Sequence, residues 1–160
     1  MGAGKTTIGK LLARQLGREF LDSDHEIERK TGVKIPLIFE LEGEPGFRKR
    51  EAMAIEALSQ LNNVVVATGG GAVLLEQNRT MLKNTGTIIY LRAKVQDLYQ
   101  RTRNDKSRPL LQGANPKRKL EQLYAVRDPI YMALADYVVD TGAQSANEIT
   151  NRIEQLLART

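Results

Sequence analysis

Apolar residues alternate along this chain between two patterns, one of helical spacing and one of short continuous runs bounded by turn residues. Helical spacing predicts helices near residues 8–16, 24–31, 47–61, 77–83, 95–103 and 146–157. The short runs predict strands at residues 18–22, 64–67, 87–91 and 137–140. Because strands that alternate with helices are typical of a parallel sheet covered by helices, we expect one α/β domain over residues 1–160.

Glycine and proline interrupt this pattern in several places. Residues 43–46 separate a short helix opened by Pro36 from the helix at 47–61. Residues 104–119 lose the periodicity and are rich in cations, so we expect a mobile lid there, with a solvated surface loop as the alternative. Helical sequence resumes at Leu120, and Pro129 predicts a break within residues 127–131 before another short helix.

The start of the chain carries the clearest chemical motif, since Gly4-Lys5-Thr6 closes a phosphate-binding loop of the form G-x-x-x-x-G-K-[ST]. Gly2 and Gly4 permit backbone angles that aim successive N–H groups at a phosphate. Lys5 is placed to reach the terminal phosphates, and the Thr6 hydroxyl suits a magnesium ion. A helix start that happens to follow two glycines is the alternative. The amphipathic run after residue 7 favours the phosphate loop.

Two carboxylates, Asp22 and Asp24, follow the strand predicted at residues 18–22. Residues two apart on an extended chain point to the same side, so both carboxylates are expected to face the phosphate loop. In the alternative reading, Asp24 caps the next helix and Asp22 is solvated. The single histidine, His25, is expected at the surface.

The helix predicted from residue 47 begins with a basic stretch that includes Arg48. Glu51 lies three residues later on the same helix face, so its carboxylate is expected to fix the Arg48 guanidinium for a two-pronged grip on a carboxylate ligand. An exposed basic helix start is the alternative.

Three glycines, Gly69, Gly70 and Gly71, follow the apolar strand predicted at residues 64–67. That strand is apolar throughout, which is typical of a strand covered on both faces. Ligands of open α/β sheets bind beyond the carboxyl ends of the strands, where a backbone without side chains can donate N–H groups at close range. We therefore expect a ligand site here, and a flexible linker is the alternative.

Composition narrows the class of partner. The chain is 41% hydrophobic and 27% charged, and its net charge of +5 suits anionic ligands. Aromatic residues make up only 5% and tryptophan is absent, so we expect no nucleic-acid partner. Without cysteine, a signal peptide or a long apolar run, the expected state is a cytoplasmic monomer with no membrane partner.

Taken together, the motifs resemble those of the shikimate kinases, a family of the nucleoside-monophosphate-kinase-like phosphate-loop proteins. The resemblance covers nearly the whole chain. The residues that carry it are 2–7, 22–24, 46–48 with Glu51, 67–71, 108–111 and 127–131.

The resemblance implies ATP-dependent phosphorylation of the 3-hydroxyl of shikimate, with Mg2+, in chorismate and aromatic amino-acid biosynthesis. It also implies an acceptor-binding region at about residues 24–61. The implied substrate-binding residues, some inside this region and some after it, are Asp24, Arg48, Gly69, Gly70, Gly71 and Arg127. The implied nucleotide-binding residues are Gly2, Ala3, Gly4, Lys5, Thr6, Thr7, Arg101 and Arg108. Lys5, Asp24 and Arg108 are the implied catalytic residues, and Thr6 and Asp22 are the implied metal-binding residues.

The resemblance also implies a three-layer fold whose parallel sheet has the order 2-3-1-4-5 and helices on both faces. In that order the first strand lies in the middle of the sheet, and both it and the first loop glycine would precede Met1. We therefore expect the first central strand to be missing from this chain, and roughly ten further residues upstream. The alternatives are a related kinase of gluconate or of a nucleoside monophosphate, and a non-catalytic nucleotide-binding module.

Overall fold

The computed structural model describes residues 2–159, and within them helices alternate with short strands. The strands are β1 (Glu19–Asp22), β2 (Val64–Ala67), β3 (Ile89–Arg92) and β4 (Tyr137–Asp140). The first helices are α1 (Lys5–Leu16), α2 (Ser23–Thr31), α3 (Ile35–Ser59) and α4 (Glu76–Thr85). Later in the chain come α5 (Val95–Thr102), α6 (Pro116–Leu134) and α7 (Ala146–Leu157). Two 3-10 helices complete the set, η1 (Gly70–Leu74) and η2 (Pro109–Leu111).

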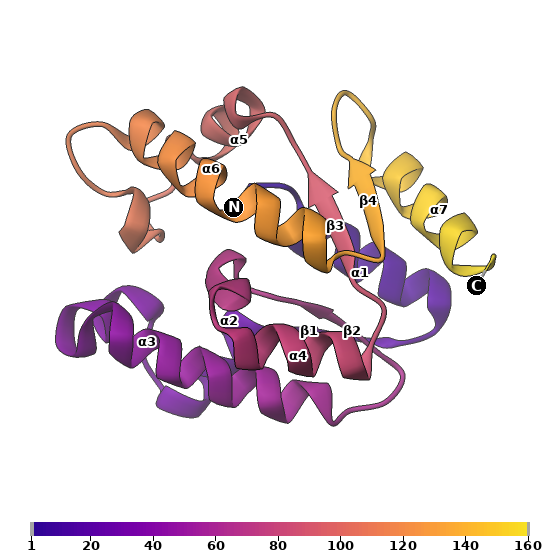
Figure 1. Ribbon diagram of the computed structural model, residues 1–160, viewed down its shortest axis with the longest axis horizontal. Coiled ribbons are helices and arrows are strands. Elements are labelled where there is room, and N and C mark those ends of the chain that lie inside the picture. The colour runs from indigo at the N-terminus through magenta and orange to yellow at the C-terminus, as the bar shows by residue number, and fades with distance from the viewer. Residues whose placement is uncertain (1, 160) are drawn as a thin grey trace.

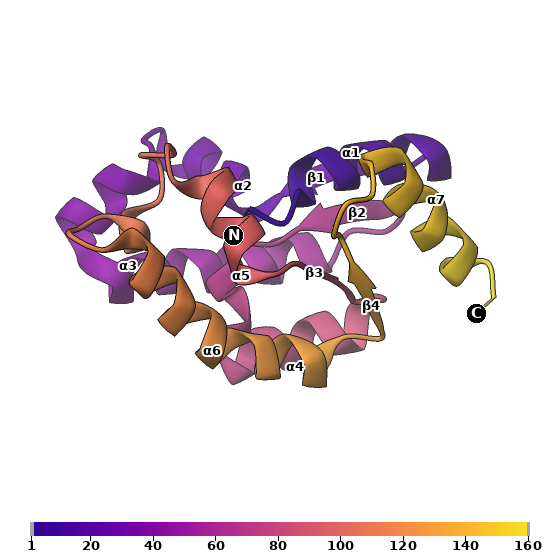
Figure 2. The ribbon, with the colours of Figure 1, turned by 90° about the horizontal axis from the view of Figure 1, so that it is seen from above.

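The strands form two separate parallel pairs within the described residues. β1 pairs with β2 from Glu19 opposite Val64 to Asp22 opposite Ala67. β3 pairs with β4 from Ile89 opposite Tyr137 to Arg92 opposite Asp140. Figures 1 and 2 show the two pairs, with α1 and α7 on one side and α4 and α6 on the other. The expected α/β class with parallel strands is confirmed.

Three clusters of buried side chains hold the helices in place. One lies between α1, β4 and α7, and another joins α2 to α3. The third packs α5, η2 and the start of α6 beside the phosphate loop. Their buried members are Ile8, Leu12, Val139, Ile149 and Ile153; Ile27, Ile38, Phe47 and Ala54; and Ala3, Ala93, Leu98, Leu111 and Leu120.

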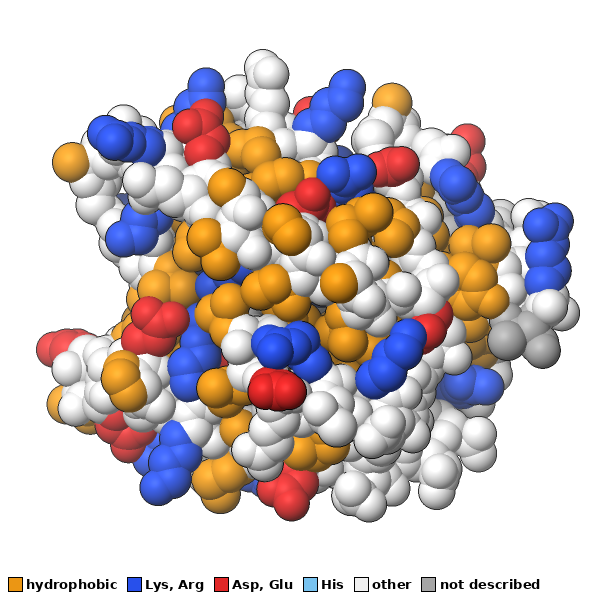
Figure 3. All heavy atoms as spheres, in the orientation of Figure 1, with side chains coloured by type: hydrophobic (Ala, Val, Ile, Leu, Met, Phe, Trp, Pro, Cys, Tyr) orange, Lys and Arg blue, Asp and Glu red, His pale blue; other side chains and the backbone are white. Residues whose placement is uncertain are grey.

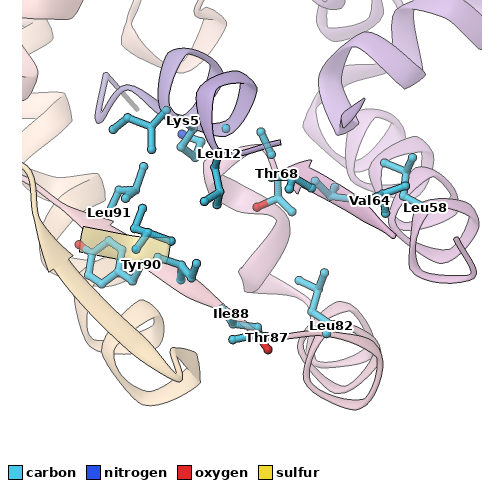
Figure 4. A pocket seen from close by; sticks show the side chains of 18 of the residues that line it. Lys5, Leu12, Leu58, Val64, Thr68, Leu82, Thr87, Ile88, Tyr90 and Leu91 are labelled. Atoms are coloured by element: carbon cyan, nitrogen blue, oxygen red, sulfur yellow. The ribbon is translucent and has the colours of Figure 1, made fainter. Parts of the chain in front are cut away.

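A slot of about 770 Å3 lies between β2 and β3. Figure 4 shows side chains of β2 and β3 on opposite walls, with Leu12 of α1 and Leu82 of α4 lining it from two further sides. Val64, Val65 and Val66 of β2 are only half-buried as a result. The expectation that this strand is covered on both faces is therefore only partly met.

Most of the predicted elements are present. α1 ends at Gly17 in the left-handed conformation, and α7 begins with a capping box between Ser145 and Glu148. The break expected near residues 43–46 is a kink in α3, where Gly43 has φ 68° and ψ −176°. None of the helices among residues 2–159 is both long enough and apolar enough to cross a membrane.

Two predictions about α6 were wrong. The helix begins at Pro116, inside the expected lid, because the Asn115 side chain accepts a hydrogen bond from the Arg118 backbone N–H and caps it. The helix also continues through Pro129 to Leu134 instead of breaking at residues 127–131. Side-chain hydrogen bonds of Asp128 and Tyr131 attach the helix on either side of Pro129, which cannot donate a backbone hydrogen bond.

Candidate functional site

The phosphate loop leads directly into α1. Gly2 and Gly4 both have positive φ, 71° and 88°, and the carbonyl of Gly4 accepts the first hydrogen bond of the helix from Ile8. A Cβ on Gly2 would lie 2.9 Å from the methyl of Thr102, so α5 packs closely against the loop. The first turn of α1 therefore presents its N–H groups and positive dipole end at the loop, which is the geometry that a phosphate-binding site needs.

Lys5 lies among the other predicted charged residues, although these come from different elements. Burial lowers the pKa of Lys5, and repulsion from Arg108 and Arg127 lowers it further. The carboxylates of Asp24 and Asp22 act in the opposite direction. All four side chains are therefore close enough to Lys5 to shift its pKa, and the fold gathers them into one site.

Asp22 and Asp24 have different local roles from those predicted. Oδ1 of Asp22 accepts hydrogen bonds from the backbone N–H groups of Asp24, at 2.9 Å, and His25, at 3.3 Å. Asp22 is thus the N-cap of α2, and the alternative in which Asp24 caps the helix is wrong. Asp24 lies in the first turn of α2 and not on an extended strand. Burial and the nearby Asp22 charge raise the pKa of the Asp24 carboxyl.

The predicted pair of Arg48 and Glu51 is confirmed. Nη1 of Arg48 lies 2.8 Å from Oε1 of Glu51, whose side chain is 1% exposed. Nη2 of Arg48 also lies 3.2 Å from Glu44. The Arg48 side chain is only 12% exposed, so the alternative of an exposed basic helix start is wrong. Burial raises the pKa of Glu51, and the Arg48 guanidinium partly opposes this effect.

The three glycines form a folded turn and not a flexible linker. A Cβ on Gly71 would overlap the guanidinium of Arg48. One on Gly69 would lie 2.8 Å from Oε2 of Glu51 and 3.0 Å from Oδ1 of Asp24. The missing side chains therefore allow the residues of α2 and α3 to reach the backbone at the end of β2.

The backbone N–H of Gly69 is already engaged, because it donates a 2.9 Å hydrogen bond to Oγ of Ser23. Ser23 is fully buried and was not identified from the sequence. Its position immediately after the Asp22 cap was the only available signal. The N–H of Gly69 is therefore not a free donor for a ligand in this structure.

Arg127 is buried on α6, with 4% of its surface exposed. Its Nε has no hydrogen-bond partner in the described part of the chain. Tyr131, one helical turn later, donates a hydrogen bond from its hydroxyl to the carbonyl of Gly70. The sequence placed Tyr131 in an expected break and in a motif of the family resemblance but gave it no role, although its spacing of four from Arg127 puts both residues on one helix face.

The expected lid and the remaining nucleotide-site residues lie around the phosphate loop. Nε of Arg108 is 2.8 Å from Oδ2 of Asp105, and the Arg108 side chain is 33% exposed. Arg101 is exposed and donates from Nη1 to the carbonyl of Gly2 at 3.1 Å. Figure 3 shows Lys and Arg side chains set among hydrophobic ones on the face drawn in Figure 1.

The residues predicted for magnesium fit a site completed by phosphates and water. No group of three or more His, Cys, Asp or Glu residues among positions 2–159 forms a metal site by itself. Magnesium usually takes only one or two protein ligands beside a nucleotide, and hydroxyl and carboxylate oxygens suit it. Thr6 is exposed in the first turn of α1, and Asp22 lies close enough to Lys5 to raise the pKa of the Lys5 ammonium.

Comparisons with known proteins agree with this arrangement. Residues 1–158 match the model of the family described as shikimate kinase. Shikimate kinase of Burkholderia lata is 58% identical over 153 residues, which cover 96% of this chain and 83% of that protein. Shikimate kinase of Thiobacillus denitrificans is 59% identical over 150 residues, which cover 94% and 82%.

Solved structures give the same result. The complex of Acinetobacter baumannii shikimate kinase with shikimate has a TM-score of 0.97 and 52% identity, and covers 99% of this chain and 89% of that one. Shikimate kinase of Aquifex aeolicus has a TM-score of 0.86 and 34% identity, and covers 99% and 92%. This chain belongs to the shikimate kinase family.

Proposed function

We propose that the residues gathered around Lys5 and Arg127 carry out ATP-dependent phosphorylation of the 3-hydroxyl of shikimate. Members of the family are phosphotransferases that use ATP with Mg2+, and their product enters chorismate and aromatic amino-acid biosynthesis. The comparisons support this reaction over a gluconate or nucleoside monophosphate kinase and over a non-catalytic module.

The observation that carries the acceptor assignment is the buried guanidinium of Arg127. A buried cation without a hydrogen-bond partner at Nε is costly, and a carboxylate ligand would remove that cost. Arg48 is held by Glu51 on the other side of the glycine turn and supplies a second guanidinium. We assign the shikimate carboxylate to these two arginines and its hydroxyls to Asp24, with backbone donors from Gly70 and Gly71.

The donor side is assigned to the phosphate loop. In this proposal the N–H groups of residues 2–7 and the ammonium of Lys5 hold the ATP phosphates. Arg108 closes over the transferring group, and Arg101 stacks near adenine. A magnesium ion bound through Thr6 and Asp22 would neutralise phosphate charge.

During transfer the acceptor oxygen forms a bond to the γ-phosphorus as the bond to the β,γ-bridging oxygen breaks, and ADP leaves. Asp24 accepts the hydroxyl proton or orients the hydroxyl for attack. A strong base is not required, because the transition state of phosphoryl transfer is loose. Lys5 and Arg108 stabilise the charge on the transferring group.

Residues 1–160 are proposed to act as one kinase domain, with residues 24–61 forming the acceptor region. Of the segment 104–119 that was expected to be the lid, residues 104–115 are proposed to act as the lid, because α6 begins at Pro116. We further propose a cytoplasmic monomer that binds no nucleic acid, since the basic side chains assigned to the site suit small anionic ligands.

We also propose the sheet order 2-3-1-4-5, in which strands 2, 3, 4 and 5 are β1, β2, β3 and β4. Strand 1 would then be a further parallel strand in the slot between β2 and β3. β2 and β3 each pair on one side only among the described residues, and both run parallel to their partners. The slot of about 770 Å3 leaves apolar residues of β2 and β3 without packing partners on this side, and a further strand would supply them.

An extended chain tests the strand. A version with about ten added N-terminal residues that contain a Val- and Ile-rich strand is compared with the same extension carrying two prolines in the strand. We expect a higher melting temperature and faster shikimate-dependent ATP turnover only without the prolines. Equal values for both versions would contradict the proposed order.

A coupled assay of ADP release tests the reaction and its acceptor. Turnover is measured with shikimate, gluconate and nucleoside monophosphates, each with and without magnesium. We expect magnesium-dependent turnover with shikimate alone. Arg48→Ala and Arg127→Ala are expected to weaken shikimate binding far more than ATP binding, and equal weakening of both would argue against carboxylate recognition.

A further inference from the structure

Asp128 links α6 to the end of β3 through three hydrogen bonds. Its Oδ1 accepts from the hydroxyl of Tyr90 at 2.7 Å and from Nε of Arg92 at 3.1 Å. Its Oδ2 accepts from Nη2 of Arg92 at 2.9 Å. Tyr90 and Arg92 are two apart on β3, so both project to the face covered by α6. This two-pronged geometry is the strongest that an arginine and a carboxylate can form.

The apolar contacts of this helix lie mainly toward its start, where Leu120, Leu123 and Tyr124 join a core cluster. Only Leu120 and Arg127 are buried among its residues, and Val126 is 61% exposed. Pro129 follows Asp128 directly and removes a backbone hydrogen bond from the middle of the helix. Its buried apolar contact, Leu120, lies toward the start of the helix, so the part weakened by Pro129 needs an attachment of its own, and the contacts of Asp128 provide it.

The partner of Asp128 is itself held from the other side. The carbonyl of Arg92 accepts from the backbone N–H of Thr141 at 2.8 Å and from its hydroxyl at 3.2 Å. Thr141 is 1% exposed. Asp128 therefore joins α6 to a rigid point at the ends of β3 and β4.

The adjacent residue, Arg127, faces the acceptor site. Tyr131 connects the same helix to Gly70, and the rings of Tyr90 and Tyr131 lie 4.8 Å apart. Arg127 thus lies between an attachment to β3 and an attachment to the glycine turn. A shift of α6 relative to β3 would move its guanidinium away from the glycine turn.

We propose that Asp128 is a positioning residue for acceptor recognition, which holds Arg127 at the site without touching the substrate. This inference rests on the proposed role of Arg127 in binding the shikimate carboxylate. Asp128 itself has no role in the proposed function. The ion pair with Arg92 is the contact through which Asp128 acts.

Asp128→Asn tests the proposal, because it removes the charge while preserving the shape of the side chain. We expect KM for shikimate to rise roughly tenfold, with kcat and KM for ATP within about twofold of the parent chain. Tyr90→Phe removes one of the three hydrogen bonds and should give a smaller change in the same direction. An equal rise in KM for both substrates would overturn the proposal.

Asp136→Asn serves as the matched control. Asp136 also accepts hydrogen bonds from a cation, Lys83, and from the backbone N–H of Ile88. It lies at the opposite end of β3 from Asp128. Its loss should leave KM for shikimate unchanged. If Asp136→Asn raises that KM as much as Asp128→Asn does, the effect is one of general stability and the positioning role is wrong.

A double-mutant cycle separates this inference from the function on which it rests. In an Arg127→Ala background, Asp128→Asn should have no further effect on shikimate binding measured by calorimetry. A full additional loss there would refute the link between the two residues. If Arg127→Ala itself leaves shikimate binding unchanged, the proposed function fails first, and the positioning role fails with it.

Discussion

The guanidinium of Arg48 occupies the space in which a side chain on Gly71 would begin. Nη1 of Arg48 lies 2.8 Å from Oε1 of Glu51, and this ion pair limits how far the guanidinium can move aside. The absence of a side chain at residue 71 is thus part of the proposed carboxylate site.

Gly71→Ala should accordingly damage acceptor recognition. Because the added methyl displaces Arg48 by about an ångström, we expect kcat/KM for shikimate to fall roughly 100-fold, with ATP binding little changed. Steady-state kinetics with each substrate varied in turn measure this. Gly86→Ala is the control, since no described atom lies within 4 Å of a Cβ at that position. A similar loss in both variants would contradict the explanation.

Asp24→Asn should increase stability at neutral pH while it reduces activity. Burial and the charge of Asp22 raise the pKa of Asp24, so the folded chain binds more protons than the unfolded chain between the two pKa values. Ionisation of Asp24 therefore costs stability as the pH rises through that interval. Asparagine does not ionise, so the variant should melt higher at pH 7, and the gain should shrink toward pH of about 4.

Thermal melts of Asp24→Asn from pH 4 to pH 8 check this expectation. Asp140→Asn, at the exposed last residue of β4, is the control, and a gain of the same size in that variant would contradict the explanation. A constant difference in melting temperature across the whole range would mean that the effect does not come from the Asp24 charge.

Removing one partner of the Arg48–Glu51 ion pair should reduce the free energy of unfolding more than replacing both partners. Arg48→Met alone leaves a buried carboxylate and is expected to reduce the free energy of unfolding by about 3 kcal/mol. Arg48→Met combined with Glu51→Leu removes both charges and should lose less than either single substitution. Urea unfolding of the three variants measures this, and additive losses would show that the two charges are not coupled.

Arg108→Ala should reduce turnover with little effect on shikimate binding. An arginine that stabilises the transferring phosphoryl group contributes on the order of 1,000-fold to kcat. Single-turnover kinetics measure the chemical step, and calorimetry measures binding. Lys106→Ala removes an exposed cation from the same segment and should change kcat by less than about twofold. A tenfold or smaller effect of Arg108→Ala would exclude this catalytic role.

Features that depend on neighbouring residues were determined by the sequence alone. The helix that follows Gly4-Lys5-Thr6, its glycine cap at residue 17 and the strand segments all follow from local spacing. The pair of Arg48 and Glu51 was predictable for the same reason, because residues three apart share a helix face. Membership of the family was evident from several short motifs in the right order.

Contacts between distant residues were decided only by the tertiary structure. Residues 128 and 92 are far apart in sequence, yet their ion pair holds α6 across Pro129, where local chemistry predicted a break. Ser23 meets Gly69 for the same reason, since the ends of β1 and β2 lie side by side. The slot between β2 and β3 likewise depends on how two strand pairs are placed, and no local propensity encodes that distance.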